Sequence, residues 1–219
     1  MRSKTRNIPL FVVIIAFGIL LTGNVYSQKL TATSLKFGYY NPKDASSGLM
    51  FGLNQGYIMD ETVDIGFSVD LFKKSYKKDT EIAKTVQAQE VTEITKQRDA
   101  EFSTIILPIM ATVNVKIPVS QFAPAFLILG GGFGWEMMFN SEHNYVTDKK
   151  ESRFYHGFGY MVSVGMLYQI GSRSALFGEM GYNGCKVSRD HKVEAGTPVW
   201  DEVNISGPIL RVGLRIGIL

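Results

Sequence analysis

The chain has 219 residues, with 23 basic and 20 acidic side chains and a formal net charge of +3 at pH 7. This near balance excludes the strongly basic surface of a nucleic-acid-binding domain, so no nucleic-acid partner is expected. Cys185 is the single cysteine, which excludes an internal disulfide. The 22 glycines and the 12% share of aromatic residues are typical of an all-β protein.

The N-terminus is predicted to be a cleavable signal peptide, residues 1–27. Basic residues between 2 and 6 precede an apolar run, Ile8–Leu21, and small residues suit cleavage after Ser27. The run is shorter than the roughly 20 residues of a spanning helix, which disfavours the alternative of an uncleaved anchor. Residues 28–219 then form one domain with 20 basic and 20 acidic side chains, because the signal peptide contains three basic residues and no acidic ones.

Beyond the signal peptide, apolar residues recur with period two. In the segment Val63–Leu71, apolar residues at odd positions alternate with Asp, Gly and Ser. Successive side chains of a strand point to opposite faces, so each such segment is predicted to be a strand with one apolar and one polar face. Eight strands are predicted, at about 30–40, 48–59, 63–75, 101–117, 122–138, 154–170, 175–187 and 204–218.

Short and long connections between these strands alternate strictly. An up-and-down meander then has all its short turns at one end and all its long loops at the other, as outer-membrane barrels do. The short connections are Asp60–Thr62, Pro118–Gln121 and Gly171–Ser174, and the long ones are Asn41–Ser47, Tyr76–Ala100, Phe139–Arg153 and Ser188–Val203.

The polar face is predicted to be the inside of a closed barrel. It combines many glycines with a few charges of both signs, which suits a crowded narrow lumen, whereas the apolar face would meet lipid. Eight strands leave room for side chains only, so the lumen is expected to be plugged and no general diffusion pore is expected. The predicted lumen residues are Lys36, Asp64, Asp70, Asn114, Lys116, Glu136, Glu179, Arg211 and Arg215.

Pairing of the last two strands predicts one specific contact. If the connection 188–203 joins neighbours, Glu179 falls opposite Arg211 inside the barrel, with Arg215 as a candidate to share the ion pair. The role expected for these side chains is structural.

The chain resembles the small eight-stranded outer-membrane barrels of the OmpA-transmembrane-domain and OmpX type over about residues 30–219. The resemblance rests on the signal peptide, the alternation, the turn and loop rhythm, and a glycine-rich face such as Gly130, Gly132 and Gly134. It implies insertion by the outer-membrane assembly machinery, contact with outer-membrane lipid and lipopolysaccharide, and structural, adhesive or host-interaction roles, with a few enzymes in the family.

Two features depart from that pattern. The chain ends on Leu219, where such barrels usually place an aromatic residue on the lipid face, and the alternation puts Ile218 outside instead. Pro108 stands inside a central strand, where it removes a ladder hydrogen bond, so a bulge or a different strand boundary is expected there.

Candidate catalytic and metal-binding residues are few. His156 falls on the apolar face of its predicted strand, where a base could meet lipid. Ser163 falls on the opposite face of that strand, and Ser174 belongs to the turn at the other end of the barrel. Glu142 and His143 lack an evident third ligand for a metal. No enzymatic activity, metal or cofactor is therefore expected.

The segment Tyr76–Ala100 is highly charged and is predicted to be either a helix or an extension of its flanking strands. Loops on rigid scaffolds often carry function, so loops 76–100 and 188–203 are candidates for an external binding surface, with a solvated loop as the alternative. The leading hypothesis is a monomeric outer-membrane barrel with a structural or surface-interaction role. The alternatives are a soluble periplasmic barrel that binds a small apolar ligand and a lipid A-modifying barrel enzyme.

Overall fold

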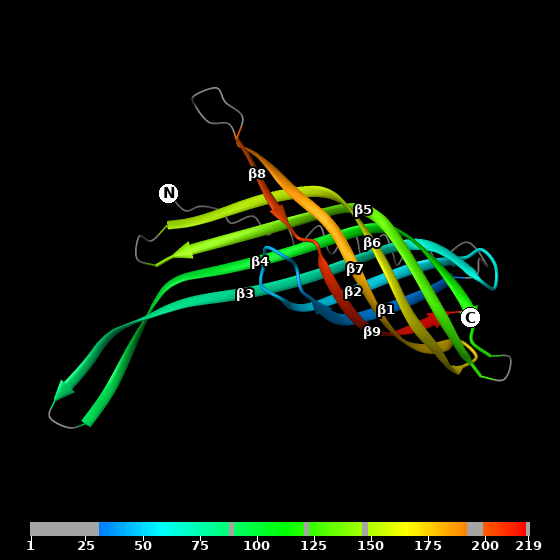
Figure 1. Ribbon diagram of the computed structural model, residues 1–219, viewed down its shortest axis with the longest axis horizontal. Coiled ribbons are helices and arrows are strands. Elements are labelled where there is room, and N and C mark those ends of the chain that lie inside the picture. The colour runs from blue at the N-terminus through cyan, green and yellow to red at the C-terminus, as the bar shows by residue number, and fades with distance from the viewer. Residues whose placement is uncertain (1–30, 88–89, 121–122, 146–148, 192–198, 218–219) are drawn as a thin grey trace.

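The computed structural model describes residues 31–87, 90–120, 123–145, 149–191 and 199–217. The predicted signal peptide and the terminal pair Ile218 and Leu219 lie outside the described residues. The described part is almost entirely β-strand (Figure 1). The strands are β1 (Thr31–Tyr40), β2 (Gly48–Ile58), β3 (Val63–Gln87), β4 (Glu90–Pro118), β5 (Ala125–Asn144), β6 (Lys149–Gly171), β7 (Ser174–His191), β8 (Val199–Asn204) and β9 (Gly207–Gly217).

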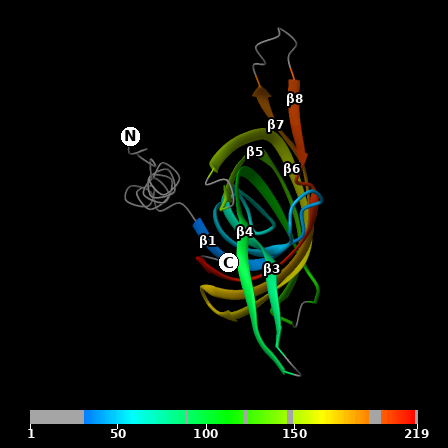
Figure 2. The ribbon, with the colours of Figure 1, turned by 90° about the vertical axis from the view of Figure 1, so that its left-hand side faces the viewer.

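These strands close into a ring of eight. Each strand from β1 to β7 pairs antiparallel with the next, and β9 pairs with both β7 and β1. The last strand is in two parts: β8 pairs with the outer end of β7, and β9 follows after Ile205 and Ser206. Figure 2, turned by 90°, shows the strands curving around a common interior. The predicted all-β, eight-stranded antiparallel barrel is thereby confirmed.

The described parts of three predicted long loops are strand. β3 and β4 extend through most of 76–100, so the prediction of extended strands is confirmed and the helical alternative is wrong. The hairpin projects far from the barrel in Figure 1. β5 and β6 likewise extend into 139–153, and β7 and β8 into 188–203. Pairing between neighbouring strands satisfies backbone groups beyond the barrel as well as within it, so the strands do not end with the apolar belt.

The expectation of a bulge or strand boundary at Pro108 is wrong. β4 runs through Pro108 with an unbroken register to β5, where Pro108 lies opposite Glu136. Between β3 and β4 the register is the same on both sides of the proline, at Val69–Ile109 and Phe72–Ile106. Asp70 and Leu71, which lie between these two pairs, have no partner on β4. Proline has no amide hydrogen, so it removes ladder bonds locally without shifting the strand.

The burial of side chains is inverted relative to a soluble barrel. Outward residues such as Phe51, Phe158 and Leu210 are 57%, 63% and 59% exposed, whereas Asp64 and Arg211 inside are 1% and 2% exposed. The period-two alternation creates this separation because one face of every strand lines the lumen. No helix among the described residues is long and apolar enough to cross a membrane.

Candidate functional site

The centre of the lumen holds a network of charged side chains around Arg211. Arg211 lies opposite Glu179 in the register of β7 and β9, and its Nε is 2.8 Å from Glu179 Oε1. Its guanidinium also reaches Asp70 from across the barrel, with Nη1 3.3 Å from Asp70 Oδ2. Lys36 Nζ lies 3.4 Å from Glu179 Oε1. The predicted contact between Glu179 and Arg211 is therefore confirmed, with Lys36 as its further partner.

A second charged group surrounds Asp64 near the short-turn end. Arg215 Nη2 donates to Asp64 Oδ2 at 2.5 Å, and Lys116 Nζ lies 3.4 Å from Asp64 Oδ1. Arg215 does not share the Glu179 pair, contrary to expectation, because it is four residues along β9 from Arg211 and faces Asp64 instead. Asn114 faces the same part of the lumen and lines a small cavity there. A buried carboxylate with two cations retains a compensated charge in the low-dielectric interior.

Charge does not fill the whole lumen, which reasoning from the sequence missed. At the long-loop end an apolar cluster extends around the inner wall, with contributions from every strand of the ring. A second cluster lies near the short-turn end on β5, β6 and β7. The first cluster contains Tyr40, Met50, Phe72, Ile106, Met110, Met138, Tyr155, Met161, Cys185, Val187, Ile205 and Ile209, and the second contains Ile128, Leu167, Ala175 and Phe177.

A small cavity lies among these side chains. The cavity between the charged groups and the second apolar cluster, near the short-turn end, has a volume of about 20 Å³. This is about the space of one water molecule. The described part of the lumen therefore contains polar and apolar layers in series.

Glu136 differs from the other predicted lumen residues because it belongs to the apolar end. It is fully buried, and its Oε2 accepts a hydrogen bond from Asn183 Nδ2 at 3.0 Å. Asn183 also donates to the Tyr40 hydroxyl, which itself donates to the Ile205 carbonyl. A side chain at position 159 would collide with the Glu136 carboxylate, so Gly159 provides the space for it. This chain of hydrogen bonds links the lumen to the junction between β8 and β9.

The structure places the candidate catalytic residues apart. His156 lies on the outer wall, stacked on Trp135 at a centroid distance of 5.2 Å and close to Phe154 at 5.7 Å. Ser163 donates to Glu179 inside the barrel, and Ser174 pairs with Gly171 at the short-turn end. The described geometry thus brings neither serine to His156.

Glu142 and His143 point to opposite faces of the hairpin formed by β5 and β6. Glu142 pairs with Arg153 at 3.6 Å, while His143 contacts the ring of Tyr145. Arg153 also donates to Glu151 at 2.7 Å, and this hydrogen bond lowers the pKa of the Glu151 carboxyl. Within the described ranges no group of three His, Cys, Asp or Glu residues could hold a metal ion.

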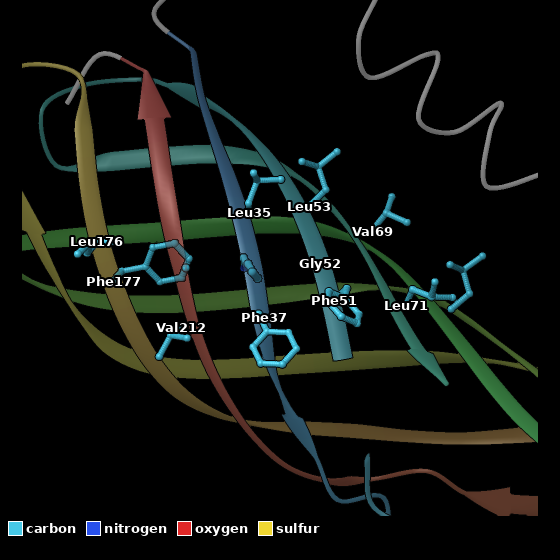
Figure 3. A pocket seen from close by; sticks show the side chains of 13 residues that line it. Leu35, Phe37, Phe51, Gly52, Leu53, Val69, Leu71, Leu176, Phe177 and Val212 are labelled. Carbon is cyan, nitrogen blue, oxygen red and sulfur yellow. The ribbon is translucent and has the colours of Figure 1, made fainter. Parts of the chain in front are cut away.

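The outer wall has a broad apolar hollow across β7, β9, β1, β2 and β3. Its volume is about 780 Å³, and Figure 3 shows the side chains that line it. Outward side chains such as Leu35, Phe51 and Val212 line it. Leu107 of β4 also lies on the outward face and lines the hollow, but it is only 5% exposed. This large cavity therefore lies on the outside of the sheet, where a soluble protein would expose polar groups.

Comparison with known proteins finds similarity in structure but not in sequence. No protein-family model and no curated protein matches the chain. A major outer membrane protein of Thermus thermophilus has a TM-score of 0.54 and 12% identity, covering 88% of this chain and 100% of that one. Ail, the attachment invasion locus protein of Yersinia pestis, solved in complex with the heparin analogue sucrose octasulfate, has a TM-score of 0.53 and 9% identity over 88% and 100%. OprG of Pseudomonas aeruginosa has a TM-score of 0.51 and 11% identity over 89% and 99%.

At these identities the similarity concerns the fold. The ring of eight antiparallel strands, the inward charges and the outward apolar belt agree with it. The chain has the fold of the small eight-stranded outer-membrane β-barrels, as the resemblance in its sequence predicted.

Proposed function

We propose that the chain is an outer-membrane barrel that acts through its projecting hairpins, as a structural or surface-interaction protein rather than as a pore or an enzyme. The inverted burial carries this proposal. An apolar surface that runs around the outer wall is far larger than the few hundred Å² that soluble monomers usually expose. The closed ring also leaves no unpaired strand edge within the belt of the described strands, which a lipid environment requires.

The same observation disfavours a soluble barrel that binds an apolar ligand. Such a protein needs a hollow interior and a wet exterior, whereas here the charged groups Asp64, Asp70 and Arg211 are buried inside. The described cavity between charged and apolar layers has room for about one water. A lipid-modifying enzyme would need a nucleophile that is hydrogen-bonded to His156. Ser163 and Ser174 lie elsewhere, and Ser188, which lies opposite His156 in the register of β6 and β7, forms no side-chain hydrogen bond with it among the described contacts.

The hairpin of β3 and β4 is the strongest candidate for the interaction surface. β3 pairs with β2 only as far as Phe72, so from Lys73 to Gln87 one edge of β3 has no strand partner among the described residues. Likewise β4 pairs with β5 only from Ala100 inward. Free strand edges can pair with an extended segment of another protein. The short-turn end would face the periplasm and this hairpin the exterior.

The proposal is tested by shortening the hairpin at a register point. Lys78 lies opposite Ala100, so residues 79–99 can be replaced by Asn-Gly, which closes a two-residue turn. We expect cells displaying this variant to insert a heat-modifiable barrel and to lose attachment to at least one protein-coated or polysaccharide-coated surface that wild-type cells bind. The substitution Asp60→Asn in the opposite turn is the matched control. Attachment equal to wild type on every surface would reject the hairpin as the interaction site.

A further inference from the structure

Four serines form a continuous row across the outer face of four strands. The register places Ser75 of β3 opposite Ser103 of β4, Ser103 opposite Ser141 of β5, and Ser141 opposite Ser152 of β6. Ser75 Oγ donates to Ser103 Oγ at 3.4 Å. With strands about 4.8 Å apart, this serine row presents hydroxyl groups over about 14 Å.

Apolar side chains lie directly on the barrel side of the serine row. Two residues away on the same face, the rings of Phe139 and Phe154 lie in tilted contact at a centroid distance of 5.0 Å, and their contacts continue to His156 and Trp135. From Leu127 to Phe139, β5 advances by twelve residues, about 40 Å along the strand and about 28 Å across a bilayer at a tilt of about 45°. The hydrocarbon core is about 30 Å thick, so the serine row stands at the level of the lipid headgroups.

Two lysines lie near the serine row on the same outward face of the sheet. Lys73 of β3 lies opposite Ile105, which lies opposite Phe139, so Lys73 is level with the phenylalanines. Lys150 of β6 lies opposite His143, two residues beyond the serine row on the side away from the barrel. Both lysines are exposed.

The carboxylates near the serine row either lie on the opposite face of the hairpin or accept a hydrogen bond from a neighbouring side chain. Glu142 lies opposite Glu151 on the other face of the hairpin, where Arg153 pairs with both. Glu101 shares the outward face, but its Oε2 accepts a hydrogen bond from the Tyr145 hydroxyl at 3.1 Å. The outward face thus combines an apolar ladder, a hydroxyl row, two exposed ammonium groups and one carboxylate that is hydrogen-bonded to Tyr145.

We propose that the serine row is the headgroup site of a phosphorylated glycolipid of the outer leaflet, of the lipid A type. The serine hydroxyls hydrogen-bond the sugar and phosphate oxygens, and Lys73 and Lys150 at opposite ends pair with phosphate groups. The acyl chains lie along the ladder of Phe139, Phe154 and Trp135, whose rings continue the apolar belt. This inference rests on the proposed function, because it requires the barrel to stand in an outer membrane with its hairpins outside.

The test measures lipid retention by the full mature chain in detergent micelles, by native mass spectrometry. The probes are bis-phosphorylated lipid A, dephosphorylated lipid A and phosphatidylglycerol. Lys73→Glu combined with Lys150→Glu is expected to weaken retention of phosphorylated lipid A about tenfold or more, since the two changes replace two cations near the headgroup by two anions. The control Lys149→Glu introduces the same charge on the opposite face of the same hairpin and should change retention less than about twofold.

A second variant separates hydroxyl recognition from charge. Replacing Ser103, Ser141 and Ser152 by valine keeps the strand propensity of the row, and we expect it to weaken retention of phosphorylated lipid A about fivefold or more. The wild type should retain phosphorylated lipid A in preference to both other probes.

Three results would overturn the inference: equal retention of phosphorylated and dephosphorylated lipid A, a preference for phosphatidylglycerol, or equal losses in the lysine pair and in Lys149→Glu. Heat-modifiability of each variant shows that it is folded, and lysine-to-glutamine changes at 73 and 150 replace any variant that is not. A wild type that fails to insert into membranes refutes the proposed function itself, whereas one that inserts without lipid selectivity refutes the glycolipid site alone.

Discussion

Replacing Arg211 by methionine tests whether the lumen network stabilises the barrel. The guanidinium is 2% exposed and lies 2.8 Å from Glu179 and 3.3 Å from Asp70. Methionine keeps much of the volume and removes the charge. Asp70 then loses the cation that pairs with it in the described lumen, while Glu179 keeps Lys36 at 3.4 Å.

The magnitude follows from the distances. At an effective dielectric constant of about 20, each of the two contacts contributes about 5 to 6 kcal/mol of attraction. The cost of desolvating the arginine offsets part of this, and removal of one partner of a buried pair typically destabilises by about 3 to 5 kcal/mol. The double variant Asp70→Asn with Arg211→Met removes the orphaned carboxylate, so it should be about 2 kcal/mol less destabilised than the sum of the two single variants.

The assay is reversible urea unfolding in lipid vesicles, with the fraction folded read from the heat-modifiable band. A free energy of unfolding for Arg211→Met within about 1 kcal/mol of wild type would refute the stabilising role. Strict additivity of the two single changes would show that Asp70 and Arg211 do not act as a pair.

Three further predictions follow from the wall and the lumen. Val162→Arg, in the middle of the outward belt of β6, should destabilise the barrel in vesicles by about 2 to 4 kcal/mol in urea titrations, and no change would indicate that this face is in water. Gly134→Ala would collide with the Ile109 carbonyl and should cost about 1 to 3 kcal/mol, whereas Gly131→Ala on the same strand has no atom within 4 Å and should be neutral by the same titration. Planar-bilayer recordings of the wild type should show no stable conductance, and long-lived open channels would contradict the layered lumen.

Much of the fold could be predicted because period-two alternation has a direct structural meaning. The segment Val63–Leu71 specifies which face of β3 is apolar, and closure follows once that face is placed in lipid. The lengths of the strands beyond the belt could not be predicted in the same way. In 76–100 the charged residues follow no alternation between apolar and polar faces, so a helix and an extended hairpin fitted equally well.

The lumen was predicted in part, for a similar reason. Parity placed Glu179 opposite Arg211, but only the three-dimensional register shows that Arg215 reaches Asp64 across the barrel. The apolar lumen cluster was not predicted, because the inward face of each strand carries both polar and apolar residues, among them Phe72 and Met161. Those residues carried a usable signal, since their parity alone assigns them to the inside.

The serine row illustrates what the sequence alone conceals. Successive members of the row, Ser75, Ser103, Ser141 and Ser152, are separated by up to 38 positions, and no spacing in the sequence relates them. Their alignment depends on the registers of three strand pairs, which at this level lie beyond the belt that the alternation defines.

The central claim, that this ring of strands spans an outer membrane with its apolar face in lipid, is tested most directly by fractionation of cells that express the full chain. We predict that the protein sediments with outer membranes and migrates faster on a gel before boiling than after it, because the closed barrel resists detergent. Recovery in the soluble periplasmic fraction, with the same mobility before and after boiling, would contradict it.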